Sequence, residues 1–348
     1  MAARRRRDGA GVKDAVGAAD RLRAGLTETI TRVLADAPAP VADVYVGWVA
    51  AAEAADCPAR YRAAGEGGWG FPGWTASTAG AAVGRAALDR HLHDATAPPG
   101  GPDLPAPLEV VRTWMRDATA AGAPGVAGWV GDLRADRDGA TMAATAAAAT
   151  RWIAGVVRVL GWPLPAGLVL LNVTRDDGPS GAAKWWPAKG SAVTVASGAD
   201  ARLGRVTGSG EFALVVHRPS SADDREVHRR ATFEAAAGAL GLRVAPDAVV
   251  VTAGDTGDRA RVVVDEAVLA AGGEMIAEVV RQRVRAMTTG YDAGDARPSA
   301  RCRWCDEAGH CPPGTAWLAG PGRWRGGLPV LRSGRASATA AVGVAPTG

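Results

Sequence analysis

The chain has 348 residues, 47% of them hydrophobic, and its 40 basic and 36 acidic residues leave a net charge of +4. This length and apolar content exclude a disordered chain and suffice for one large or two moderate packed domains. No run of 18 or more apolar residues is present, and no apolar segment follows the basic start at Arg4–Arg7. We therefore expect a cytoplasmic protein with neither a membrane span nor a secretory signal.

The N-terminal part of the chain is predicted to be mainly helical. Residues 1–40 have the pattern of a basic, polar and partly helical leader that ends at Pro38-Ala39-Pro40. Beyond it, residues 41–165 are expected to form one helical region that carries Cys57. Helices are predicted there at 43–56, at 77–93 and within the alanine-rich segment 108–160, with a linker at 98–107.

The pattern changes near residue 167, where short β-branched runs separated by turn residues begin. Strands are predicted at 168–173, 192–195, 212–216, 248–252 and 261–264. A helix at 225–241 separates the third strand from the fourth, and a long amphipathic helix follows at 265–288. We expect residues 166–315 to form an α/β core that ends in a cysteine knuckle, and residues 316–348 to form a flexible tail.

The four cysteines are candidate ligands of one metal centre. Cys302, Cys305 and Cys311 form a C-x2-C-x5-C run that offers three thiolates, and Cys57 is the remaining cysteine of the chain. Four cysteines are too few for a disulfide scaffold in a chain of this length, and the lack of a signal argues for a reducing compartment. The alternatives are a zinc site in which His310 joins the C-terminal cysteines, an ordinary surface thiol at Cys57, and a disulfide.

The element Cys57-Pro58-Ala59-Arg60-Tyr61, followed far downstream by the cysteine run and Pro312, resembles the iron–sulfur branch of the RecB/AddB-type PD-(D/E)XK nucleases. The resemblance extends from about Tyr45 to Pro312. It implies an α/β fold with a restriction-endonuclease-like (PD-(D/E)XK) core sheet flanked by helices. It also implies a [4Fe–4S] cluster held by all four cysteines. Zinc is the alternative cofactor, but it leaves the Cys-Pro-x-Arg-Tyr element without a role.

The same resemblance implies where the nuclease site would be, and most of its expected groups are missing. Asp200 stands at the position of a metal-binding aspartate, whereas Gly84 replaces a histidine. Val216 and Arg218 replace the acidic residue and the lysine of the next strand. Glu211 is a candidate substitute for the missing carboxylate, and an active site of this type would need Mg2+ or Mn2+. Because arginine does not deprotonate in proteins, we expect the site to be degenerate and hydrolysis to be inefficient.

These features predict a catalytically degenerate iron–sulfur protein that binds DNA or serves as a subunit of a DNA repair or defence complex. Arg202, Arg205 and Arg218 are the candidate phosphate contacts, and such contacts bind DNA without reading its sequence. One alternative is an active metal-dependent DNA exonuclease with a rearranged site and a helicase partner. Another is a protein-interaction scaffold in which the cluster is purely structural.

Overall fold

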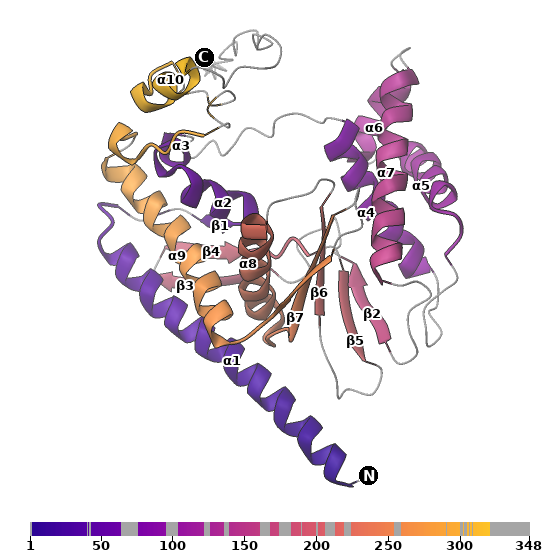
Figure 1. Cartoon of the computed structure of the whole chain (residues 1–348), viewed down its shortest axis with the longest axis horizontal. Helices are drawn as coiled ribbons and strands as arrows, with labels where there is room; N and C mark the ends of the chain where they lie inside the picture. Colours follow the sequence, from indigo (N-terminus) through magenta and orange to yellow (C-terminus); the bar gives the residue numbers. More distant parts are fainter. Residues whose placement is uncertain are drawn as a thin grey trace, which may run out of the picture.

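The structure is a computed structural model with a mixed α/β fold that is mostly helical, and its described strands form two small sheets (Figure 1). It describes residues 2–39, 41, 43–63, 76–94, 104–121, 126–135, 139–160, 168–173, 182–188, 190–199, 201–205, 213–218, 224–253, 259–289, 291–299, 302, 305, 307 and 309–320. Within these ranges, no helix combines the length and the apolar character needed to cross a membrane.

Helices dominate the first part of the chain and alternate with strands in the second. The first part contains α1 (Ala2–Ala35), β1 (Val44–Val46), α2 (Trp48–Asp56), α3 (Pro58–Ala63), α4 (Ala76–Asp94), α5 (Pro107–Ala121), α6 (Val126–Ala135) and α7 (Gly139–Leu160). The second contains β2 (Leu168–Val173), β3 (Ala183–Ala188), β4 (Ser191–Val195), β5 (Ala201–Arg205), β6 (Ala213–Arg218), α8 (Asp224–Leu242), β7 (Ala248–Ala253), β8 (Arg259–Val263), α9 (Glu266–Thr288), a 3-10 turn η1 (Ala293–Asp295) and α10 (Pro312–Ala319).

The smaller sheet has the strand order β1-β4-β3 and joins the two parts of the chain. β1 runs parallel to β4, with Val44 opposite Val193 and Val46 opposite Val195. The helix predicted at 43–56 is therefore wrong for its first residues, although α2 confirms the rest. Val44 and Val46 are buried and Tyr45 is exposed, which is the alternation of a half-buried strand. The strand could not be predicted from the sequence, because three residues are too few to reveal an alternating pattern and the partner strand β4 lies far along the chain.

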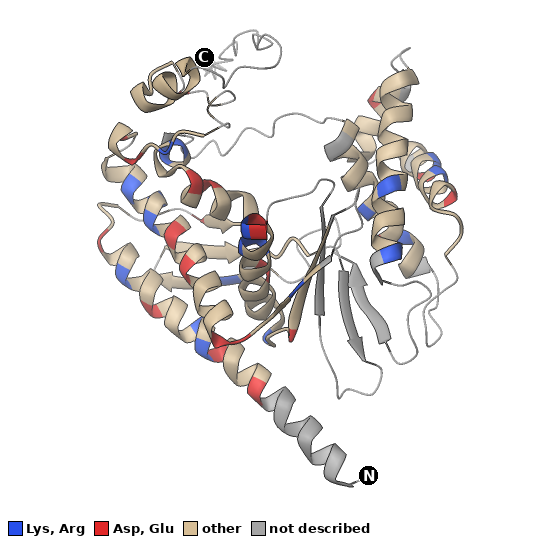
Figure 2. Ribbon diagram, viewed as in Figure 1, with Lys and Arg blue, Asp and Glu red and all other residues tan. Residues whose placement is uncertain are grey.

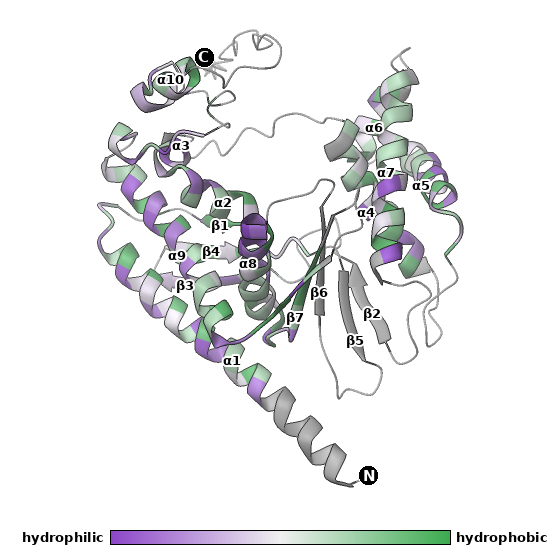
Figure 3. Ribbon diagram, in the orientation of Figure 1, coloured by the Kyte–Doolittle hydropathy of each residue, from purple (hydrophilic) through white to green (hydrophobic). Residues whose placement is uncertain are grey.

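The larger sheet has the strand order β2-β5-β6-β7-β8. β2, β5 and β6 pair antiparallel, β6 and β7 pair parallel, and β8 returns antiparallel to β7. The parallel step requires a crossover, and α8 supplies it. β7 is mostly hydrophobic (Figure 3), and its Val249 and Val251 are buried beneath α8. The core predicted at 166–315 therefore contains two sheets, because β3 and β4 pair with β1 instead of with β2 or β6.

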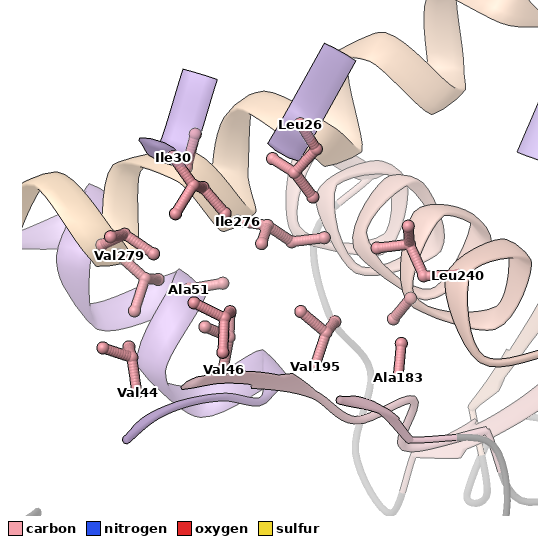
Figure 4. Packing of buried hydrophobic residues seen from close by; sticks show 14 of the residues in the cluster. Leu26, Ile30, Val44, Val46, Ala51, Ala183, Val195, Leu240, Ile276 and Val279 are labelled. Atoms are coloured by element: carbon pink, nitrogen blue, oxygen red, sulfur yellow. The ribbon is translucent and has the colours of Figure 1, made fainter. Parts of the chain in front are cut away.

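The main hydrophobic core lies between the smaller sheet and the helices α1, α2, α8 and α9. Figure 4 shows side chains from these elements pointing toward one another, including Ile30 of α1, Val195 of β4 and Ile276 of α9. On α1 the buried residues recur at the helical period as Ala19, Leu26, Ile30 and Leu34. From Ala19 to Leu34, the segment predicted as a polar leader therefore packs into the folded domain.

The helices α4 to α7 form a second unit with a core of its own. Val83, Val111, Trp152 and Ile153 are among its buried residues. Residues 44–63 pack with the main core instead, so the helical unit spans 76–160 and is shorter than the predicted 41–165 region. At the C-terminus, α10 extends the described fold to Gly320, beyond the predicted start of the tail at 316.

Candidate metal centre

The structure brings the four cysteines together around one cavity. Cys57 lies in the break between α2 and α3, Cys311 is the residue that caps α10, and Cys302 and Cys305 lie in the segment before it. All four line the same cavity, although Cys57 and the other three come from opposite ends of the chain. Cys57, Cys302 and Cys311 are buried, and Cys305 is partly exposed.

Local backbone turns orient each cysteine toward the cavity. The N–H of Cys57 donates to the carbonyl of Glu53 at 3.0 Å, which ends α2, and Pro58 then starts α3. In the knuckle, the N–H of Cys302 donates to the carbonyl of Ser299 at 2.9 Å, and the N–H of Cys305 donates to the carbonyl of Cys302 at 3.1 Å. The C-x2-C spacing therefore forms a tight turn, as a pair of ligands to one centre requires.

Backbone N–H groups also approach two of the sulfur atoms. The N–H of Ser299 donates to the Sγ of Cys302 at 3.3 Å, and the N–H of Gly314 donates to the Sγ of Cys311 at 3.3 Å. The second donor belongs to the first turn of α10, where the helix dipole favours negative charge. Such N–H···S bonds stabilise bound thiolates and tune iron–sulfur clusters.

Gly314 leaves space beside two of the sulfurs that a side chain would fill. A Cβ atom at this position would lie 3.1 Å from the Sγ of Cys311 and 3.7 Å from the Sγ of Cys302. Gly314 is buried and lines the cavity together with the cysteines. The local sequence therefore keeps side-chain bulk away from the thiols, which fits a site built to hold an additional group.

The pKa shifts of Cys305 and Tyr291 agree with a common environment for the four cysteines. Burial raises the pKa of the Cys305 thiol, a backbone hydrogen bond at Glu307 and the charge of Arg60 oppose the shift, and Cys57 and Cys302 add to it. Burial, the contact with Cys311 and the Coulombic influence of Cys57 and Cys305 raise the pKa of Tyr291 well above its ordinary value. The Tyr291–Cys311 approach lacks the geometry of a well-formed hydrogen bond, so we regard it as an electrostatic contact.

The all-sulfur donor set suits an iron–sulfur cluster or a structural zinc ion. Among the described residues, no three His, Cys, Asp or Glu side chains are arranged to hold a metal ion as they stand. Zinc binds thiolate sulfur at about 2.3 Å, so the thiols would have to rearrange to bind it. The cavity measures about 20 Å³, which is room for about one water molecule, so its lining would have to rearrange around a cluster.

His310, the fourth ligand of the zinc alternative, is exposed, whereas Cys57 lies at the cavity with the other cysteines. The geometry therefore favours four cysteines over three cysteines and one histidine. It also disfavours a surface thiol at Cys57, whose side chain is buried. All four cysteines are free, so the disulfide alternative is not present in this structure.

The residues of the predicted nuclease site are only partly within the described chain. Asp200 and Glu211 lie outside the described residues, and the side chains of Arg202, Arg205 and Arg218 are likewise outside that part. The backbone places Arg202 and Arg205 on β5 and Arg218 on the neighbouring strand β6. Arg202 pairs with Leu214, so positions 202 and 218 share one face of the sheet and position 205 belongs to the other. This register separates Arg205 from the other two candidate phosphate contacts.

Gly84, which occupies the place of the expected histidine, packs tightly against α7. A Cβ atom at this position would lie 2.9 Å from the ring of Trp152 and 3.0 Å from the carbonyl oxygen of Ala149. The two helices can approach this closely only because residue 84 has no side chain. A histidine is therefore excluded sterically at this position while α4 and α7 keep their present packing.

Three features of the two sites were not predicted from the sequence. Arg60 and Glu53 form a buried ion pair beside Cys57, and Tyr291 faces the thiols from the segment after α9. Before β5, the buried carboxylate of Glu234 on α8 accepts hydrogen bonds from Ser197 Oγ at 2.8 Å and from the N–H of Gly198 at 2.7 Å. These residues have no characteristic spacing, and only the Arg60 position was marked, as part of the cysteine motif.

No protein-family model matches the chain, and no curated protein is significantly similar to it in sequence. The class to which the protein belongs must therefore be inferred from its own residues and geometry.

Proposed function

We propose that this chain is an iron–sulfur protein with a RecB/AddB-type PD-(D/E)XK nuclease fold, a degenerate nuclease site and a role in DNA binding. The observation that carries the proposal is the convergence of Cys57 with Cys302, Cys305 and Cys311 on one cavity. In this proposal the cluster is bound by these four thiolates and closes the fold by joining α2 and α3 to the C-terminal segment. No catalytic step is assigned to it.

The arrangement of the larger sheet supports the nuclease-like part of the proposal. The segment that would carry the metal-binding aspartate comes directly before β5, and the strand that would carry the next acid and the lysine is β6. These two strands are antiparallel neighbours, with Ala201 opposite Val215. The start of β5 and the end of β6 therefore lie next to each other at the same end of these two strands, as a shared metal site on neighbouring strands requires.

The packing of Gly84 supports the loss of hydrolytic function. The position expected to carry a histidine is filled by a helix–helix contact. Val216 cannot bind a cation, and Arg218 cannot accept a proton from water. A site that retains only Asp200 of these groups lacks the charge to hold Mg2+ or Mn2+ firmly.

Metal analysis of anaerobically purified full-length protein tests the cluster. We expect iron and acid-labile sulfide in stoichiometric amounts, close to four of each per chain, and broad visible absorbance that bleaches on reduction. The physical reason is the donor set of four thiolates with backbone N–H groups on two sulfurs. Stoichiometric zinc without iron would contradict the proposal.

Binding of labelled DNA at increasing salt concentration tests the DNA-binding role. We expect the logarithm of the association constant to fall linearly with that of the salt concentration, because phosphate contacts release counterions. Arg202→Gln and Arg218→Gln should each reduce the slope by about 1 on duplex DNA. Arg32→Gln is the matched control, since this exposed arginine pairs with Glu28 on α1.

The same assay distinguishes the proposal from its two alternatives, an active metal-dependent exonuclease and a protein-interaction scaffold. With Mg2+ or Mn2+ added, we expect the labelled DNA to remain intact. Degradation that is lost in Asp200→Ala would instead establish an active nuclease. Salt-independent or undetectable DNA binding would leave a protein scaffold as the better description.

A further inference from the structure

Arg60 is a buried positive charge at the four-cysteine cavity. It follows Cys57 by one turn of chain on α3, its side chain is 7% exposed, and it lines the cavity with the thiols. Figure 2 shows the basic residues on this short helix. A charge so well shielded from water acts on its neighbours with little screening by solvent or salt.

Glu53 of α2 holds this guanidinium in place. The two side chains form an ion pair in which both are almost fully buried. Glu53 also receives the N–H of Cys57 on its backbone carbonyl, so the ion pair and the cysteine are fixed by the same turn. Of the two charged partners, Arg60 is the one that contacts the cavity. The positive member of the pair is therefore the one that borders the cavity lined by the four thiols.

A cluster held by four thiolates is anionic, and reduction adds one more negative charge. Net charge, hydrogen bonds to sulfur and solvent exposure are the protein's means of setting the reduction potential. A buried cation near the sulfurs stabilises the reduced form more than the oxidised form, because the reduced form carries the greater negative charge. An exposed cation at the same distance has a smaller effect, because water screens it.

We propose that Arg60 raises the reduction potential of the bound cluster and that Glu53 is the positioning residue for its guanidinium. This inference rests on the proposed cluster. The redox step concerned transfers one electron from an external one-electron donor to the cluster. One ferric ion becomes ferrous, the donor is oxidised by one electron, and no bond or proton is exchanged.

Redox titration of the full-length protein, followed by its visible absorbance, tests the inference. We expect Arg60→Gln to lower the midpoint potential by at least about 59 mV, which corresponds to a tenfold change in a one-electron equilibrium. Arg60→Lys keeps the charge and should recover more than half of that shift. Arg297→Gln is the matched control, because Arg297 also lines the cavity but is exposed, where it donates to the carbonyl of Ala55 at 3.0 Å.

Glu53→Gln provides a test of sign. It removes the negative charge of the pair, while the amide oxygen of the glutamine can still accept a hydrogen bond from the Arg60 guanidinium. The cation therefore stays in place and the midpoint potential should rise. A shift in the same direction as in Arg60→Gln would overturn the inference, as would equal shifts in Arg60→Gln and Arg60→Lys. If Arg60→Gln loses the cluster, its retention in Arg60→Lys supports the role of the charge, and its loss in both contradicts it. Absence of iron from the unsubstituted protein would overturn the proposed function itself, before any variant is compared.

Discussion

Replacement of Cys57 by alanine is expected to abolish metal binding and to destabilise the protein strongly. Cys57 supplies the one thiol from the N-terminal part of the chain, and the other three lie within the knuckle. Without Cys57, the proposed cluster would have no ligand from the segment of α2 and α3, so it could not link that segment to the C-terminal knuckle. Binding that occurs only in the folded state adds to folding stability, about 4 kcal/mol for a ligand at about 1,000 times its Kd. We expect near-complete loss of iron and a loss of unfolding free energy of that order.

Iron content, visible absorbance and urea unfolding followed by tryptophan fluorescence measure this effect. The same measurements on Gly314→Ala test the cavity with all four thiols retained, since the added methyl would crowd the sulfurs of Cys311 and Cys302. We expect that variant to lose a large part of its iron. Gly309→Ala in the same knuckle is the matched control, because a Cβ atom there would have no neighbour within 4 Å. Full iron content in Cys57→Ala would remove the main support for the shared centre.

Three long helices and five of the eight described strands were predicted because their patterns are local, whereas β1, β3 and β5 were not predicted. The predicted helix at 77–93 is α4, the helix at 225–241 is α8 and the helix at 265–288 is α9, each within a residue at either end. β3 was missed because the Lys184-Trp185-Trp186-Pro187 segment lacks the alternation of a strand and contains a proline. It forms because β4 follows it after a tight turn and because Trp185 fills the main core.

The set of four cysteines could be predicted because the chain contains only these four. The groups that surround them could not be predicted from the sequence. The ion pair of Glu53 and Arg60 depends on the angle between α2 and α3, and the position of Tyr291 depends on how the chain leaves α9. The proposed nuclease site shows the same limit. The sequence identified Gly84 as a substitution, but only the approach of Trp152 explains why a larger residue cannot replace it.

Replacement of Glu234 by glutamine is expected to cost about 3–5 kcal/mol of unfolding free energy, because it breaks a buried ion pair and leaves one charge uncompensated. The Glu234 side chain is fully buried, and its carboxylate pairs with the Nη2 of Arg230 at 2.8 Å. It also accepts the hydrogen bonds from Ser197 and Gly198 that hold the turn before β5. Arg230 is mostly buried itself and lies over the ring of Trp48, with 5.1 Å to the ring centroid.

Urea unfolding of matched variants separates the charge from the packing. Asp224→Asn changes an exposed carboxylate in the first turn of the same helix and should cost less than about 1 kcal/mol. Ser197→Ala removes one of the hydrogen bonds and should cost about 1–2 kcal/mol. Because Ser197 and Glu234 act on the same turn, the double variant should lose less than the sum of the single losses. If Glu234→Gln lowers the unfolding free energy no more than Asp224→Asn does, the buried carboxylate does not hold the turn that precedes β5.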